Sequence, residues 1–110
     1  MKEDLSPLER RCIEMIVNDN WPSFRLDGLR VLRRENTGVG KFVTLRDLHQ
    51  QHLSDNVYET RASRIEMEGV ELGLDLSITV SDGRIDFLEL VTPGDDGWDG
   101  VERPWRIYGE

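Results

Sequence analysis

The chain has 110 residues, of which 33% are charged and 37% hydrophobic, a balance typical of one soluble globular domain over residues 1–110. No apolar run is long enough to cross a bilayer, and the N-terminal segment lacks the apolar stretch of a signal peptide. The only cysteine, Cys12, excludes an intramolecular disulfide. We therefore expect a cytoplasmic protein with no membrane partner.

The net charge of −8 is unevenly distributed along the chain. Residues 1–54 carry nine Lys and Arg against eight Asp and Glu, whereas residues 55–110 carry five against fourteen. An acidic surface repels the phosphate backbone, so we expect no nucleic-acid partner. Such a surface attracts a basic protein, although acidic charge can also serve solubility alone.

The first predicted element is an amphipathic helix that begins after Ser6. Ser6 can cap the helix, Pro7 suits the first helical position, and Glu9 completes a capping box. The helix is expected to end at residues 18–20, before Pro22. Its apolar stripe, with a spacing of three and four residues, consists of Leu5, Leu8, Cys12, Met15 and Ile16.

Two strands joined by a glycine turn follow at residues 29–36 and 41–45. The turn contains Thr37, Gly38 and Gly40 and precedes a lysine, as in a phosphate-binding loop. A nucleotide loop, however, needs a longer GxxxxGK spacing followed by Ser or Thr and a helix. We therefore interpret the glycines as residues that permit positive φ in a hairpin.

Residues 47–60 are polar and lack strand periodicity, which predicts a long connection. His49 and His52 lie three residues apart in it, but no third ligand is near in the sequence. A metal site needs three or four ligands, so we expect no metal ion, and no cofactor is expected either. Residues 63–68 alternate apolar and charged side chains and form either a separate strand or the start of the next one.

The clearest pattern is a β-hairpin at residues 69–92. Apolar residues occupy every second position from Leu72 to Val80, which is the period of a strand with one buried face. Asp82 and Gly83 suit the two positive-φ positions of a tight turn, and a second apolar strand follows at residues 85–91.

A two-residue turn would place Glu89 opposite Leu76, on the apolar face of this hairpin. A buried carboxylate there has to be protonated, paired with an arginine, or bonded to backbone amides such as those of residues 37–40. Three alternatives stay open: a solvated position at the edge of the core, a structural tether, and a catalytic acid. A three-residue turn would instead turn Glu89 outward. The candidate arginine partners are Arg33, Arg34 and Arg46.

Residues 93–100 form a predicted loop in which a tryptophan is surrounded by acidic residues, and residues 105–108 form a last strand. Pro104 restricts this strand to the edge of a sheet. An aromatic side chain among acids is typical of a protein-binding surface, although it could equally fold back over the sheet. The candidate binding residues are Asp95, Asp96, Trp98, Asp99, Glu102, Trp105 and Tyr108.

Taken together, several of these motifs resemble a family of small bacterial proteins. The shared features are a TGVG turn followed by Phe, a glycine-containing strand, a DG turn and a Leu-Glu pair, and they span about residues 29–100. The resemblance implies an immunity protein of a bacterial toxin system, such as contact-dependent inhibition. The chain departs from the pattern at Lys41, where a second apolar or aromatic residue is more usual. The matching residues are Thr37, Gly38, Val39, Gly40, Phe42, Gly69, Gly73, Asp82, Gly83, Leu88 and Glu89.

We therefore expect an α+β fold in which a twisted antiparallel sheet of four to six strands carries the N-terminal helix on one face. The expected function is that of an immunity protein or antitoxin, not an enzyme, that binds a cognate basic toxin domain through an acidic surface. The alternative is a small-ligand binding module with a pocket formed by Glu89, the arginines and the turn at residues 37–40. The predicted core consists of Leu8, Cys12, Met15, Ile16, Val31, Phe42, Leu72, Leu74, Leu76, Ile78, Val80, Ile85, Phe87 and Val91.

Overall fold

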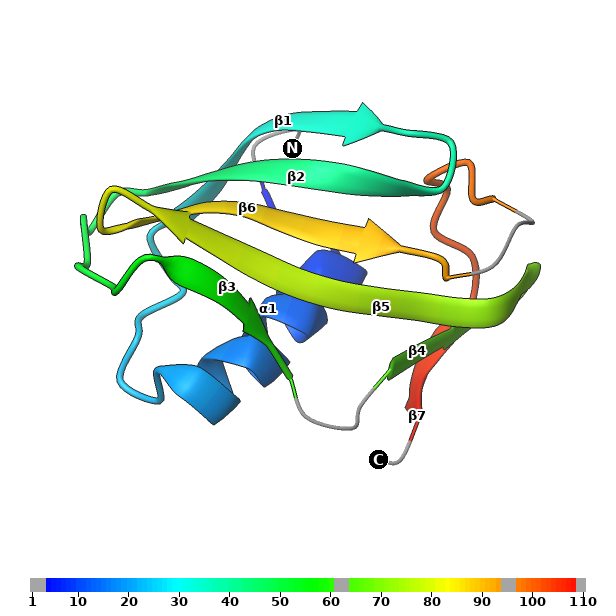
Figure 1. Ribbon diagram of the computed structural model, residues 1–110, viewed down its shortest axis with the longest axis horizontal. Helices are drawn as coiled ribbons and strands as arrows, with labels where there is room; N and C mark the ends of the chain where they lie inside the picture. The colour runs from blue at the N-terminus through cyan, green and yellow to red at the C-terminus, as the bar shows by residue number, and fades with distance from the viewer. Residues whose placement is uncertain (1–3, 61–63, 94–96, 109–110) are drawn as a thin grey trace.

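The computed structural model describes residues 4–60, 64–93 and 97–108. In this part of the chain, a seven-stranded sheet lies against one helix, so the fold is α+β (Figure 1). The strand order is β1-β2-β6-β5-β4-β7, β3 also pairs with β5, and every described pairing is antiparallel. The elements are α1 (Pro7–Asn20), β1 (Leu29–Asn36), β2 (Gly40–Asp47), β3 (Asn56–Glu59), β4 (Arg64–Met67), β5 (Val70–Ser81), β6 (Arg84–Val91) and β7 (Trp105–Tyr108).

Helix α1 begins at the predicted capping box. The Ser6 amide donates to Glu9 Oε1 at 2.9 Å, and the Glu9 amide donates to Ser6 Oγ at 3.1 Å, so each of these two amides finds an acceptor at the start of the helix. The helix ends at Asn20 as predicted, and no helix among the described residues is long and apolar enough to cross a membrane. Its apolar side chains join the core against one face of the sheet, here called the inner face.

Strand β5 is the longest strand of the sheet and connects β6 on one side with β3 and β4 on the other. One edge of β5 pairs with β6, while the other edge pairs with β4 near Val70 and with β3 near Val80. The change of partner occurs beyond Gly73, which has a φ of +70°. A Cβ atom there would lie 2.4 Å from the carbonyl oxygen of Ile65, so glycine allows β4 to approach closely.

The sheet has seven strands where four to six were predicted. The additional strand, β3, lies in the segment that was predicted as a connection. Only Tyr58 is half-buried in β3 and its other residues are exposed, so this short strand carries no apolar alternation that periodicity could detect. Residues 64–67 form the separate strand β4, which settles the alternative left open for that segment.

A β-bulge in the β5–β6 hairpin corrects the predicted register. The turn itself is as predicted, because Ser81 faces Arg84 and Val80 faces Ile85. Thr79 then faces Phe87, so Asp86 is an extra residue in β6. One extra residue inverts the alternation beyond it.

The core differs in part from the predicted one, and the bulge accounts for the change at Phe87 and Val91. Phe42, Phe87 and Val91 are only half-buried, and Leu72 is 51% exposed. Their places on the inner face of the sheet are taken by residues of the opposite parity, namely Val43, Leu45, Leu88 and Leu90.

Candidate functional site

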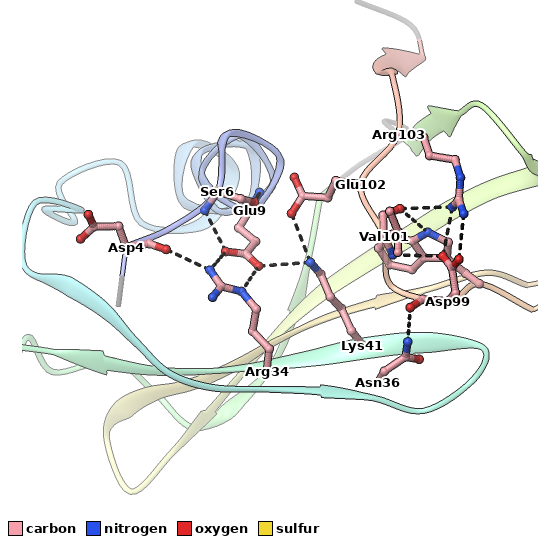
Figure 2. A network of polar contacts seen from close by, with 11 residues as sticks. Asp4, Ser6, Glu9, Arg34, Asn36, Lys41, Asp99, Val101, Glu102 and Arg103 are labelled. Carbon is pink, nitrogen blue, oxygen red and sulfur yellow. Dashed lines mark hydrogen bonds and ion pairs between the residues drawn. The ribbon is translucent and has the colours of Figure 1, made fainter. Parts of the chain in front are cut away.

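A cluster of charged side chains lies between the start of α1 and the β1–β2 hairpin (Figure 2). The Glu9 side chain is fully buried, and its two carboxylate oxygens accept hydrogen bonds from Arg34 Nε and Nη2, both at 2.7 Å. Lys41 Nζ lies 3.2 Å from Glu9 Oε2. A buried carboxylate of this kind is tolerated because cations and hydrogen-bond donors replace its water.

Lys41 projects from the inner face of the sheet, in phase with Val43, and only 6% of it is exposed. Its Nζ lies 3.2 Å from Glu102 Oε2 and 5.6 Å from the centroid of the Trp98 ring. Two carboxylates and two cations therefore balance one another in this cluster.

The environment of Glu9 favours its ionised form. Burial raises the pKa of this carboxyl, but the hydrogen bonds from Arg34 and the Ser6 amide, together with the charge of Lys41, outweigh burial and hold the pKa below 4.5. The same pairing with Glu9 raises the pKa of Arg34. The cluster is therefore a closed ion-pair network that joins three segments of the chain.

Residues 97–103, here called the strap, follow β6 in the chain and contribute Glu102 and Trp98 to the surroundings of Lys41 (Figure 2). The Trp98 amide donates to the Gly38 carbonyl at 3.0 Å, and Trp98 Nε1 donates to the Val101 carbonyl at 3.0 Å. Only 3% of Trp98 is exposed. Its predicted place as a surface anchor is therefore wrong, and the ring folds back over the sheet, which was the other alternative considered.

The described acidic residues of the strap are engaged within the molecule. Asp99 accepts two hydrogen bonds from Arg103, at 2.7 and 3.0 Å, which lower the pKa of Asp99 to about 2. Its carbonyl accepts a hydrogen bond from Asn36 Nδ2. Glu102 is paired with Lys41. The two other predicted acids, Asp95 and Asp96, lie outside the described residues.

Glu89 lies on the outer face of the sheet, opposite Ser77 and Phe42, and not opposite Leu76 as predicted. The Asp86 bulge causes this difference, because it reverses which side chains of β6 point inward. Within the described residues Glu89 makes no ion pair with the predicted arginines. Arg34 faces the Glu9 cluster instead, and Arg33 and Arg46 are exposed on the outer face.

The turn at residues 37–40 is occupied by neighbouring segments of the chain. The Thr37 amide donates to the Gly40 carbonyl, and the Gly38 amide donates to Asn36 Oδ1. The Gly38 carbonyl accepts from the strap. A Cβ atom at Gly40 would lie 2.1 Å from the carbonyl oxygen of Leu90. These amides are therefore not directed at Glu89 or at a pocket beside it.

A groove of about 950 Å³ lies between β4 and the start of β5. A second hollow of about 430 Å³ adjoins it and includes Trp105. Leu72 and Tyr108 are 51% and 57% exposed at this groove, so large apolar side chains remain uncovered there. Neither hollow includes Glu89 or the turn. The groove is lined by Arg64, Glu66, Met67, Gly69, Val70, Glu71, Leu72, Gly73 and Tyr108.

Charge at this β4–β5 groove is only partly balanced. Arg106 lies 3.2 Å from Glu66, and Arg64 lies 3.5 Å from Asp75. Glu71, on the groove, makes no ion pair among the described residues. An incoming cation would therefore find an unpaired carboxylate beside exposed apolar surface.

The surroundings of His49 and Cys12 favour neither a metal site nor a reactive thiol in the described part of the chain. Among residues 4–60, 64–93 and 97–108, no three His, Cys, Asp or Glu side chains come together to hold a metal ion. His49 Nε2 lies 2.9 Å from Asp27 Oδ1 on an exposed loop. Burial raises the pKa of the Cys12 thiol, and Glu102 and Glu9 raise it further, so this thiol is not poised to ionise.

Sequence reasoning missed the roles of Glu9 and Lys41 in the cluster. Glu9 was assigned to the capping box, which it does form, but its burial depends on α1 docking against β1. The available signal was the alternation Lys41, Val43, Leu45, which places the lysine on the inner face.

Comparison of the chain with protein-family models, curated proteins and solved structures gave no match. The resemblance to bacterial immunity proteins thus stays a prediction.

Proposed function

We propose that the protein is an immunity protein that neutralises a cognate toxin domain by direct binding, without catalysis. The observation that supports this proposal is the β4–β5 groove, which exposes Leu72 and Tyr108 beside Glu71. Apolar anchors inside a polar rim are typical of protein interfaces. The net charge of −8 favours a basic partner.

In this proposal, a basic side chain of the toxin domain pairs with Glu71 while an apolar neighbour packs on Leu72 and Tyr108. Binding would act by occlusion, because a partner held across the groove would present less of its own surface to its substrate. We place the complex in the cytoplasm, which agrees with a free cysteine that is buried. The proposed surface keeps Trp105 and Tyr108 from the sequence-based set.

The test begins with capture of the partner from source cells by the tagged chain, followed by calorimetric titration of the purified partner. We expect Tyr108→Ala and Glu71→Lys each to weaken binding by about tenfold or more, since each removes an anchor or reverses a steering charge. Glu14→Lys on α1 is the matched charge-reversal control and should bind as the wild type does.

Two results would count against this proposal in different ways. If no toxin domain is captured from cells that express one, the immunity function is wrong. If a toxin domain binds both groove variants as tightly as the wild type, the function stands and the groove is not the interface.

A further inference from the structure

The outer face of the sheet, turned away from α1, is covered by no other helix or strand among the described residues (Figure 1). Phe42 of β2 and Phe87 of β6 meet near its centre, with ring centroids 5.2 Å apart and an edge-to-face angle of 81°. Both rings are only half-buried. An aromatic pair at the centre of an open sheet face marks a surface suited to association.

Positive charge lies on one side of this aromatic pair. Arg33 of β1 is paired in register with Thr44, and Arg30 is paired with Arg46 of β2, so the three arginines share the outer face. Arg33 approaches Glu35 only to 3.9 Å, and the two side chains are 71% and 57% exposed. Ion pairs this exposed contribute little, so Arg33 remains open to an outside partner.

Negative charge lies on the other side of the pair. Glu89 of β6 faces Ser77 of β5, and Ser77 in turn faces Glu59 of β3, which places both carboxylates on the outer face. Asp75 of β5, opposite Val91, adds a third carboxylate at the same side, and Arg64 at 3.5 Å partly neutralises it. The outer face thus carries an excess of arginines on the β1–β2 side, reduced by Glu35, and an excess of carboxylates on the β6–β5–β3 side, reduced by Arg84. These are called the arginine half and the carboxylate half, and the two phenylalanines lie between them.

We propose that the outer face is the interface of a homodimer, with a second copy of this chain as its occupant. A two-fold axis that lies in the interface, parallel to the strands and beside the phenylalanine pair, places the arginine half of each copy on the carboxylate half of the other, so each favourable contact occurs twice. A partner that was uniformly acidic or basic would match only half of the face. The dimer uses no residue that lines the β4–β5 groove and is independent of the immunity function.

The test compares two charge-reversed variants by sedimentation equilibrium. Arg33→Glu with Arg46→Glu makes the outer face predominantly acidic, and Glu59→Arg with Glu89→Arg makes it predominantly basic. We expect the wild type to be dimeric at about 100 µM and each variant to dimerise about tenfold more weakly or worse. Their equimolar mixture should form a heterodimer, which also shows that both variants are folded.

Arg10→Glu with Arg25→Glu is the matched control, because it changes the net charge equally outside the outer face and should leave the dimer intact. A wild type that is monomeric at about 100 µM would overturn the proposal. A dimer that persists unchanged in both outer-face variants would also overturn it.

A cross-linking measurement covers the case in which the charge variants fail to fold. Thr44→Cys places a thiol beside the phenylalanine pair, close to the proposed two-fold axis, whereas native Cys12 is buried. Mild oxidation should link two Thr44→Cys chains and leave Asn18→Cys, on α1, unlinked. Equal cross-linking of the two variants, or none at Thr44→Cys, would overturn the proposal.

Discussion

Arg34 holds Glu9 through two parallel hydrogen bonds, from Nε and Nη2 to the two carboxylate oxygens, each 2.7 Å long. The pair joins the first turn of α1 to β1 across 25 residues of sequence. The planar guanidinium matches the carboxylate in both distance and direction, which makes this among the stronger forms of ion pair. The pair therefore links the first turn of the helix to β1.

Glu9→Gln should destabilise the fold strongly, because it leaves Arg34 and the buried Lys41 without their shared counter-ion. Breaking a buried ion pair from one side typically costs about 3–5 kcal/mol. The free energy of unfolding in urea, followed by circular dichroism, measures this cost. Glu14→Gln on the same helix is the control and should stay within about 0.5 kcal/mol of the wild type. Equal values for the two variants would contradict the role assigned to the cluster.

Lys41→Met should cost less than Glu9→Gln, at most about 2 kcal/mol. Arg34 still neutralises Glu9 in this variant, and Glu102, whose side chain is 25% exposed, regains contact with water. The apolar methionine also suits a position on the inner face. The same urea titration provides the comparison, and a larger loss for Lys41→Met than for Glu9→Gln would show that the lysine dominates the network.

Acidification should reduce the stabilising contribution of Glu9. Its pKa in the folded protein lies below the ordinary value of 4.5. At pH values between the folded and the unfolded pKa, the unfolded chain therefore binds more protons than the folded protein does. The contribution is complete above about pH 4.5 and is lost as the pH falls through the folded pKa. The difference in unfolding free energy between wild type and Glu9→Gln should therefore shrink on acidification, while Asp99 is common to both proteins and cancels. A difference that grew in acid would refute the direction given.

Trp98→Ala should destabilise the fold by about 3–5 kcal/mol, because it removes a buried aromatic ring and the hydrogen bond from Nε1 to Val101. Trp98→Phe should retain most of the packing and lose less. Thermal unfolding ranks the variants. The control is Trp105→Phe, at a half-buried position on β7, which should cost less than Trp98→Ala. A fully stable Trp98→Ala protein would mean that the strap does not close the core.

Gly40→Ala should be more damaging than Gly38→Ala, although both glycines lie in one turn. A Cβ at Gly40 meets the Leu90 carbonyl oxygen at 2.1 Å, so β2 and β6 would have to separate, at a cost of about 2–3 kcal/mol. A Cβ at Gly38 meets nothing within 4 Å, and only its φ of +86° is unfavourable, by about 1–2 kcal/mol. Urea unfolding of the two variants gives the order, and the reverse order would contradict the β2–β6 packing.

Local features of the chain were predictable because neighbouring residues make them. Ser6 and Glu9 lie three residues apart and bond to each other's amides, so the start of the helix could be identified before any tertiary contact was known. Asp82 and Gly83 adopt φ values of +54° and +76°, which are the turn conformations that their residue types favour.

The face on which Glu89 lies was not predictable in the same way. The turn was assigned correctly, but the extra residue Asp86 reverses every side chain that follows it in β6. A bulge is stabilised by how β6 packs between β2 and β5, and the alternation of apolar residues within one strand does not contain that information.

Local conformational preferences and short-range periodicity were sufficient to predict the α+β class, the capped helix, the glycine turn and the DG hairpin. Tertiary contacts, by contrast, bury Glu9 and Lys41 together, pair Glu102 with Lys41, and bring the Trp98 ring over the lysine. Lys41 and Glu102 are 61 residues apart, and their attraction is strong only after α1, β2 and the strap have excluded water from between them. Contacts of this kind depend on the low dielectric constant of the folded interior, which arises only when distant segments of the chain pack together.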